Sequence, residues 1–289
     1  MASRWVLLLS LAIVSVNLAE ADLEAIFVFG DSIVDVGTNN DLNSSAKANY
    51  PYYGIDYPYS QSTGRFSNGY NTADMIVKQL GDYQKSPPPF LSLTKRMSTF
   101  NTTVLRGVNF ASAGSGIFHE TGQKFGEVIP LGLQIQQFTT VQANITAVLS
   151  PDKAQRLISN SLYIISVGSN DLFDYQEKPT VPPETLLINL TEAYCNHLKD
   201  LYNLGARKFA VIGVPPIGCV PAVRAHNTSG GGCQEEMNEL ARAFYNATEN
   251  LLLEFSIAFN GVKYSLGNSY AITMNIIHNP RANRRHPFF

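Results

Sequence analysis

Residues 25–32 of this 289-residue chain read AIFVFGDS, and the first five of them form a short, continuous apolar run. Such a run, followed at once by Gly30, is typical of a parallel β-strand that is covered on both faces. The run leads directly into Asp31 and Ser32. In an open α/β sheet, ligands bind beyond the carboxyl ends of the strands. Residues 25–32 therefore predict the first strand of such a sheet, with a serine hydroxyl at its functional edge.

Similar short apolar runs recur along the chain, separated by longer amphipathic stretches. We expect strands at residues 25–29, 104–110, 162–167, 208–213 and 262–266. Two helices are indicated by apolar residues at helical spacing: Leu187, Leu190, Tyr194, Leu198 and Leu201, with Gly205 as the stop, and Met237, Leu240, Phe244, Leu251 and Phe255. This alternation predicts one α/β domain over residues 22–289, a three-layer sandwich with a parallel five-stranded sheet.

The composition excludes several classes of protein. The chain is 45% hydrophobic and 15% charged, and 21 Lys and Arg against 23 Asp and Glu give a net charge of −2. It is too apolar for intrinsic disorder, and it has no global charge that would attract nucleic acid or an anionic membrane. We expect no nucleic-acid partner.

Residues 1–21 predict a secretory signal peptide. Arg4 precedes an apolar run over residues 5–16, and Ala19-Glu20-Ala21 fits an A-x-A site, so we expect cleavage after Ala21. An N-terminal anchor helix is the alternative, although the run is short for a transmembrane span. No later stretch is long and apolar enough to cross a bilayer. We therefore expect a secreted, extracellular protein of the apoplast or cell wall, with no integral membrane segment after cleavage.

Two further features fit export. Six Asn-x-Ser/Thr sequons are candidate glycosylation sites: Asn43, Asn101, Asn144, Asn189, Asn227 and Asn246. An oxidising compartment also permits disulfides. Cys219 and Cys233 flank a loop rich in Pro and Gly, and we expect them to pair, which leaves Cys195 without a partner.

Common metal and cofactor motifs are missing from the sequence. There is no G-x-S-x-G, no H-E-x-x-H, no P-loop and no zinc-spaced Cys/His set. Gly114-x-Gly116 lacks the third glycine of a dinucleotide fingerprint. Asp31, Asp35 and Asp41 do not follow the order of an EF-hand. We expect neither a metal nor a cofactor.

Polar or small residues follow three of the predicted strands. Ser32 follows the first, the stretch 109–116 with Gly114 follows the second, and Asn170 follows the third. A serine oxygen with converging N–H donors is the pattern of acyl transfer, a nucleophile and an oxyanion hole. Each piece alone also fits an ordinary turn or cap.

Several strings of residues carry a resemblance to a known family. They are FGDS (29–32), DVGTNN (35–40), GRFSNG (64–69), GVNFAS (107–112), VGSND (167–171) and PPIGCVP (215–221). With them the chain resembles the plant GDSL esterase/lipase family of the SGNH hydrolases, from about residue 26 to about residue 283. The resemblance implies a flavodoxin-like fold and metal-free hydrolysis of carboxylic esters of lipids, acylated sugars or small acyl substrates. By position it makes Ser32 the nucleophile, and the N–H groups of Ser32 and Gly114 with the Asn170 amide the oxyanion hole.

The chain departs from the family at its end. The family's last block, Asp-x-x-His-Pro, supplies the base and its carboxylate, but the last aspartate here is Asp200. His286-Pro287 imitates that block with Asn283 in place of the aspartate, and a neutral Asn does not stabilise an imidazolium. No catalytic His or Asp is identifiable, and we expect structural or surface roles for His119, His197, His226 and His278. The chain looks C-terminally truncated relative to the family.

The sequence thus predicts a secreted serine hydrolase that cleaves lipid or acylated small-molecule or sugar esters. Because the base is missing, a non-catalytic or weakly active isoform that binds acyl or glycan ligands stays open. A structural cell-wall glycoprotein would fit the sequons but would leave the strand-end motifs unexplained.

Overall fold

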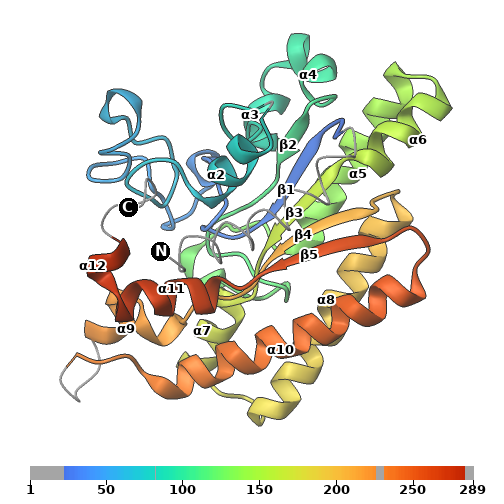
Figure 1. Ribbon diagram of the computed structural model, residues 1–289. Coiled ribbons are helices and arrows are strands. Elements are labelled where there is room, and N and C mark those ends of the chain that lie inside the picture. The colour runs from blue at the N-terminus through green and yellow to red at the C-terminus, as the bar shows by residue number, and fades with distance from the viewer. Residues whose placement is uncertain (1–22, 82, 226–230, 284–289) are drawn as a thin grey trace.

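The protein is described by a computed structural model over residues 23–81, 83–225 and 231–283, and a parallel sheet lies at its centre (Figure 1). The strands are β1 (Ile26–Gly30), β2 (Gly107–Asn109), β3 (Leu162–Ser166), β4 (Lys208–Ile212) and β5 (Lys263–Gly267). They lie in the order β2-β1-β3-β4-β5, and every neighbouring pair is parallel. The predicted α/β fold with a five-stranded parallel sheet is confirmed.

Helices connect the strands. The α-helices are α2 (Thr72–Gln79), α3 (Phe90–Thr94), α4 (Met97–Thr103), α5 (Leu131–Val148), α6 (Pro151–Asn160), α7 (Ser169–Glu177), α8 (Pro183–Asn203), α9 (Pro221–Ala225), α10 (Glu235–Ala258), α11 (Ser269–His278) and α12 (Pro280–Asn283). Short 3₁₀ turns are η1 (Thr38–Asp41), η2 (Pro58–Ser60), η3 (Gln123–Phe125) and η4 (Ile217–Cys219). Within the described ranges, none of the helices could span a bilayer.

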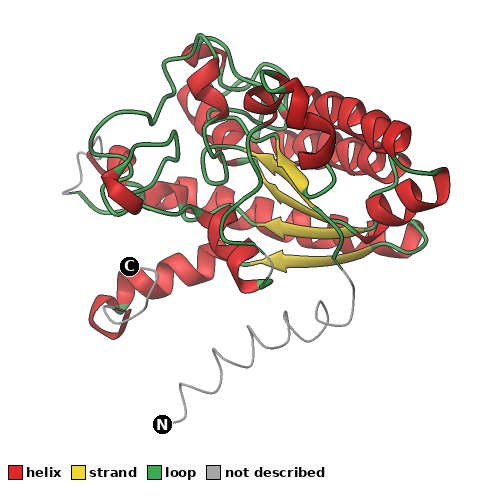
Figure 2. Cartoon of the chain, turned by 90° about the horizontal axis from the view of Figure 1, so that it is seen from above, coloured by secondary structure: helices red, strands yellow, loops and turns green. Residues whose placement is uncertain are grey.

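Side chains from the two faces of the sheet pack into two separate hydrophobic cores, because successive side chains alternate between the faces along each strand. Phe27 and Phe29 of β1 and Tyr163 of β3 join the buried residues of α5, α8 and α10. On the opposite face, Ile26 and Val28 pack with α2. The strands all point the same way, and long loops gather beyond their carboxyl ends (Figure 2). This is the edge at which the sequence places Ser32.

One strand is shorter than expected. We expected residues 104–110 to be extended, but β2 begins only at Gly107. Val104 caps α4 and its N–H donates to the Phe100 carbonyl, and two further turn bonds carry the chain to Gly107. A Cβ at Gly107 would lie 1.9 Å from the Ile26 carbonyl oxygen, so the strand enters the sheet only where a glycine stands. The apolar run therefore includes the end of a helix.

Some sequence predictions fall outside the described residues. These are the signal peptide over residues 1–21 with its cleavage site, the sequon at Asn227, and the histidines His226 and His286.

Candidate active site

The turn after β1 presents Ser32. β1 ends at Gly30, where a Cβ would lie 1.9 Å from the Ser166 carbonyl oxygen, and the next N–H, that of Asp31, donates to this same oxygen at 2.9 Å. The chain then makes one helical turn, in which the Asp35 N–H donates to the Asp31 carbonyl at 3.0 Å. Ser32 lies in this turn and is half-buried. The strand end thus fixes the backbone on both sides of the serine.

The loop after β2 is tied directly to the end of β1. The Ser112 N–H and the Ser115 hydroxyl both donate to the Gly30 carbonyl, at 2.9 and 2.7 Å. Gly114, between these two serines, has φ +85°, and the Cβ of any other residue there would lie 2.9 Å from the ring of Phe125. The position therefore requires glycine. These bonds hold the loop that carries Gly114 against the strand end that precedes Ser32.

The third strand-end motif closes onto the same loop. Asn170, in the first turn of α7, donates from Nδ2 to the Ser115 carbonyl at 2.8 Å. The neighbouring Asp171 accepts the N–H groups of Ile117 and Phe118 at 2.9 and 3.1 Å. Its carboxylate also accepts the hydroxyl of Thr121 at 2.7 Å. The motif after β3 therefore fixes the loop that carries Gly114.

Three N–H groups in this cluster of residues are available to donate a hydrogen bond to a ligand. Within the described part of the chain, neither the Ser32 N–H nor the Gly114 N–H donates to a protein acceptor. The Asn170 amide uses one N–H on Ser115 and retains a second. The three strand-end residues that the sequence singled out are thus joined through Gly30 and Ser115, which are linked by a hydrogen bond.

Buried carboxyl groups surround the serine turn. Burial raises the pKa of Asp31 to about 7, and the charges of Asp171 and Asp35 add to this effect. Burial likewise raises the pKa values of Asp35 and Asp171 to about 6. Asp31 accepts the Ile33 N–H through Oδ1, while its Oδ2 has no partner among the described residues. Of the three carboxyl groups, Asp31 is the one with an oxygen that lacks a hydrogen-bond partner among the described residues.

Two of the three scattered aspartates, Asp35 and Asp41, are bound to other groups of the protein. Asp35 accepts the N–H groups of Gly37 and Thr38, both at 2.8 Å, and that of Ala113 at 3.0 Å. Asp41 forms an exposed ion pair with Lys95 at 2.6 Å. Both carboxylate oxygens of Asp35 and Oδ1 of Asp41 thus have protein partners, whereas Oδ2 of Asp31 has none among the described residues.

The described histidines are not hydrogen-bonded to the serine hydroxyl. His197 on α8 is hydrogen-bonded through Nε2 to the Ile117 carbonyl at 3.0 Å, and His119 and His278 are exposed. None of these three is hydrogen-bonded to Ser32 in the described part of the chain. No histidine base for Ser32 is therefore identified among the described residues.

Sequence reasoning missed a buried glutamine. Gln134 on α5 is fully buried, and its Oε1 accepts the Gly30 N–H at 2.8 Å. Its Nε2 donates to the Gly30 and Ile129 carbonyls and to the Ser115 hydroxyl. The available signal was one polar residue, Gln134, among the buried apolar positions of a helix. It was missed because only residues at strand ends were considered.

A buried ion pair was also missed. Arg65, within the GRFSNG string, donates from Nε and Nη2 to the two carboxylate oxygens of Asp74 at 2.6 and 2.9 Å. Its Nη1 lies 3.4 Å from the Val36 carbonyl, four residues after Ser32. Asp74 also caps α2 by accepting the Asn71 N–H, and it accepts the Ser86 N–H. The pair joins three loops at the carboxyl edge.

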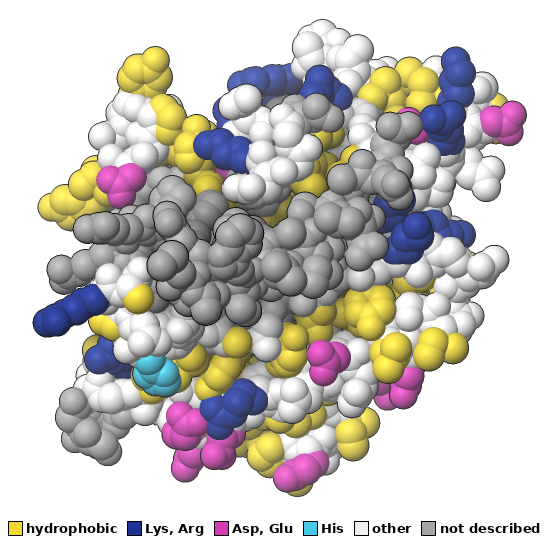
Figure 3. Space-filling view, in the orientation of Figure 1, with side chains coloured by type: hydrophobic (Ala, Val, Ile, Leu, Met, Phe, Trp, Pro, Cys, Tyr) yellow, Lys and Arg dark blue, Asp and Glu magenta, His cyan; other side chains and the backbone are white. Residues whose placement is uncertain are grey.

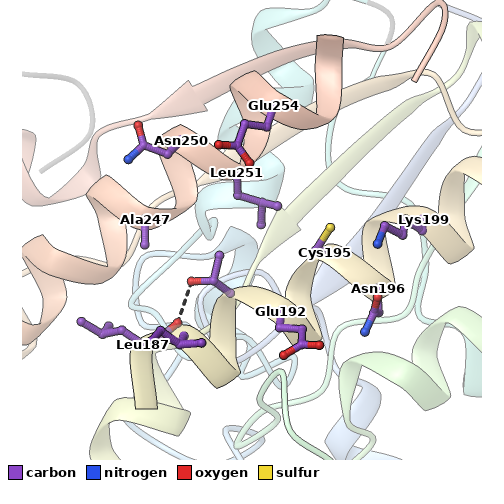
Figure 4. Close-up of a pocket in the computed structure, with 11 residues that line it drawn as sticks. Leu187, Glu192, Cys195, Asn196, Lys199, Ala247, Asn250, Leu251 and Glu254 are labelled. Carbon is purple, nitrogen blue, oxygen red and sulfur yellow. Dashed lines mark hydrogen bonds between the residues drawn. The ribbon is translucent and has the colours of Figure 1, made fainter. Parts of the chain in front are cut away.

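The remaining predicted sites are the cysteines and the sequons. Cys219 and Cys233 are joined in a disulfide, and Cys195 is a free thiol. Of the sequons in the described ranges, Asn144 is half-buried and the others are exposed: Asn43, Asn101, Asn189 and Asn246. A groove of about 540 Å³ lies between α8 and α10, with Cys195 pointing into it opposite Leu251 (Figure 4). It contains none of the strand-end residues.

Comparisons with known proteins place this cluster in a family context. The family described as GDSL-like Lipase/Acylhydrolase matches residues 26–281. One GDSL esterase/lipase of Arabidopsis thaliana is 38% identical over 272 residues, covering 90% of this chain and 70% of the relative. Another from the same plant is 36% identical over 291 residues, covering 96% of this chain and 78% of the relative.

A solved structure is also matched. It is that of a catalytic mutant of an acetylxylan esterase from Geobacillus stearothermophilus, with 11% identity, a TM-score of 0.41, and coverage of 90% of this chain and 83% of that one. The family assignment rests on the sequence matches, which extend over nearly all of the described residues. The chain belongs to the GDSL esterase/lipase family and is a carboxylic ester hydrolase by class.

Proposed function

We propose that this protein is a secreted hydrolase that cleaves carboxylic esters by acyl transfer to Ser32. In the first step, Ser32 Oγ attacks the ester carbonyl and the alcohol leaves; in the second, water attacks the acyl-enzyme and releases the acid. Lipid esters and acylated sugars or small molecules are the substrate classes that the family resemblance favours. The single observation that carries the proposal is the hydrogen-bonded link from the Ser32 turn to Gly114 and Asn170 through Gly30 and Ser115.

We further propose that three N–H groups stabilise the oxyanion of the tetrahedral intermediate. They are the backbone N–H groups of Ser32 and Gly114 and the second amide N–H of Asn170. Support comes from their lack of other acceptors in the described part of the chain. Donors fixed by a network such as that of Asp171 need little reorganisation as charge develops, which is the basis of this form of catalysis.

The proton of Ser32 Oγ requires an acceptor, and none of the described histidines is hydrogen-bonded to this oxygen. This observation favours a second candidate function, a weakly active or non-catalytic chain that binds acyl or glycan ligands. Serine hydrolases that lose a triad member retain roughly 10³–10⁴-fold catalysis over water. Weak turnover of activated esters therefore remains compatible with the site.

Export is proposed on separate grounds. The sequence of residues 1–21 fits a signal peptide, and the described sequons lie at or near the surface. The Cys219–Cys233 disulfide also fits an oxidising compartment.

The test measures hydrolysis of p-nitrophenyl butyrate by the secreted chain, by Ser32→Ala and by the matched variant Ser256→Ala. Ser256 is half-buried on α10, and its hydroxyl donates to the Leu253 carbonyl within the same helix. We expect activity in the parent and in Ser256→Ala, and its loss in Ser32→Ala. Labelling of Ser32 by a fluorophosphonate probe reports the nucleophile independently of turnover. Equal rates in all three proteins, with no labelling of Ser32, would exclude the esterase proposal.

A further inference from the structure

Exposed apolar side chains gather on one loop, residues 50–60, here called the tyrosine loop. Tyr50, Tyr52, Ile55 and Tyr59 are 51%, 82%, 49% and 100% exposed. In the space-filling view, hydrophobic side chains project at the upper left, where this loop runs in Figure 1 (Figure 3). They are four of the ten large, exposed hydrophobic residues in the described part of the chain. An apolar cluster of this kind indicates an interaction surface.

Ring contacts and backbone hydrogen bonds fix the tyrosine loop to the segment that follows it. The half-buried Tyr53 packs edge-on against Phe66, with ring centres 5.6 Å apart, and Tyr57 packs against Tyr70 at 4.9 Å. Two backbone bonds join the loop to the GRFSNG string, from Gly54 N–H to the Ser67 carbonyl and from Asp56 N–H to the Asn68 carbonyl. A fixed loop loses little conformational freedom when its exposed side chains bind a partner.

The tip of the loop has a strained backbone. Tyr59 and Ser60 have φ values of +63° and +49°, in the left-handed region that residues with a side chain rarely adopt. Tyr59 is fully exposed, so its ring gains no packing energy within the described chain that would offset this conformation. Backbone strain of this type clusters at sites that contact ligands.

The tyrosine loop lies on the same side of the molecule as the serine turn. Asn40 Nδ2 donates to the Thr63 carbonyl at 3.0 Å, and Arg65 Nη1 approaches the Val36 carbonyl. Both contacts join the segment that follows the loop to the segment that follows Ser32. The loops lie beyond the carboxyl ends of the strands in both views (Figures 1 and 2).

We propose that the tyrosine loop docks the protein onto the surface of a zwitterionic lipid bilayer. The tyrosine loop contains no Lys or Arg and only one charged side chain, Asp56. Of the flanking cations, Arg65 is buried and paired with Asp74, and Lys47 donates to the Asn40 and Leu42 carbonyls. Attraction to anionic headgroups therefore does not drive the contact. Tyrosine suits the boundary between headgroups and acyl chains, because its ring is apolar and its hydroxyl stays hydrated.

The test uses Ser32→Ala as the background, so that no lipid is hydrolysed during binding. Cosedimentation with phosphatidylcholine vesicles should show binding that persists at about 1 M salt, where the Debye length is about 3 Å. Adding Tyr52→Ser and Tyr59→Ser should lower the partition coefficient by about tenfold or more. Ile257→Ser, at a 78% exposed position on α10, is the matched control and should bind like the parent. Tyr59→Trp should bind more tightly.

Several outcomes would overturn the proposal. They are no vesicle binding, equal binding by the double tyrosine variant, binding only when the vesicles contain phosphatidylglycerol, or retention on cellulose without retention on vesicles. Because binding is measured without turnover, any of these results leaves the hydrolysis of soluble esters by the parent chain as a separate question.

Discussion

The side-chain amide of Gln134 holds the backbone of Gly30 through both of its polar groups. Its Oε1 accepts the Gly30 N–H at 2.8 Å, and its Nε2 donates to the Gly30 carbonyl at 2.9 Å. The same Nε2 lies 3.2 Å from the Ser115 hydroxyl, which also donates to Gly30. One buried side chain therefore sets the distance between the strand end before Ser32 and the loop that carries Gly114. Gln134 positions the site without reaching substrate.

Replacing Gln134 by methionine should lower kcat for ester hydrolysis by about tenfold to a hundredfold, because small displacements of reacting groups are costly. KM should change little. The buried Gly30 N–H loses its partner, which should destabilise the fold by about 1–3 kcal/mol. Gln136→Met, at an exposed position on the same helix, is the control. Unchanged kcat in a folded Gln134→Met protein would contradict the positioning role.

Gln134→Glu adds a test by pH. A protonated glutamic acid can accept the Gly30 N–H and donate to the Gly30 carbonyl, whereas an ionised one repels that carbonyl. Burial should raise the folded-state pKa of this glutamate, so the variant should be most stable at low pH and lose stability as pH rises through that pKa. Urea unfolding of parent and variant across pH measures the difference. A variant whose unfolding free energy follows the parent at every pH would count against the geometry.

The strand ends could be predicted from the sequence because a buried parallel strand is a short apolar run with a sharp stop. Ser32 and Asn170 directly follow such stops, and the covering helices bury Leu190 and Leu198 as their spacing indicates. Gln134 could not be predicted as part of the site, since it lies 104 residues from Gly30 along the chain. Its partners are backbone atoms, which leave no complementary residue pattern to recognise.

Asn170→Ala should lower kcat by about 10²–10³-fold, the usual effect of removing one oxyanion donor. It also removes the bond to the Ser115 carbonyl, so a small loss of stability is expected. Steady-state kinetics with a soluble p-nitrophenyl ester, beside thermal unfolding, separates the two effects. Asn250→Ala, exposed on α10, is the matched control. A loss of stability with unchanged kcat would assign Asn170 a structural role only.

Asp171→Asn should destabilise the protein by about 1.5–3 kcal/mol, because the carboxylate accepts two backbone N–H groups and a hydroxyl. An amide in its place would turn an N–H toward those donors. Asp174→Asn is the variant for comparison. Asp174 accepts only one backbone N–H and is more exposed, so this substitution should lower the free energy of unfolding by less. Urea unfolding at about pH 8, where Asp171 is ionised, measures both. Equal losses in the two variants would argue against the special role of Asp171.

Arg65→Met should cost about 3–5 kcal/mol of stability, because it leaves the fully buried carboxylate of Asp74 without its cation. Replacing both residues, as Arg65→Met with Asp74→Leu, should recover part of this loss. Lys95→Met breaks the exposed pair with Asp41 and should cost at most about 1 kcal/mol. Denaturant unfolding of all variants tests the ranking. An Arg65→Met protein as stable as Lys95→Met would mean that Asp74 does not depend on the pair.

The buried aspartates predict a pH dependence whose upper part belongs to Asp31. Its pKa is about 7 in the folded protein against a usual value of 3.8, because burial disfavours its charge. The folded state therefore holds the proton more tightly, and its contribution to stability is complete below about pH 4 and lost as pH rises through about 7. The pKa values of Asp35 and Asp171 are about 6, so the stability that these two groups contribute is lost at a lower pH. Asp31→Asn should remove the decline between about pH 6 and 7 and reduce the decline between about pH 4 and 6, where Asp35 and Asp171 also contribute. Unfolding free energies measured at intervals across this range decide the point, with Asp41→Asn as the control, and an unchanged slope above about pH 6 in the Asn variant would show that Asp31 does not titrate there.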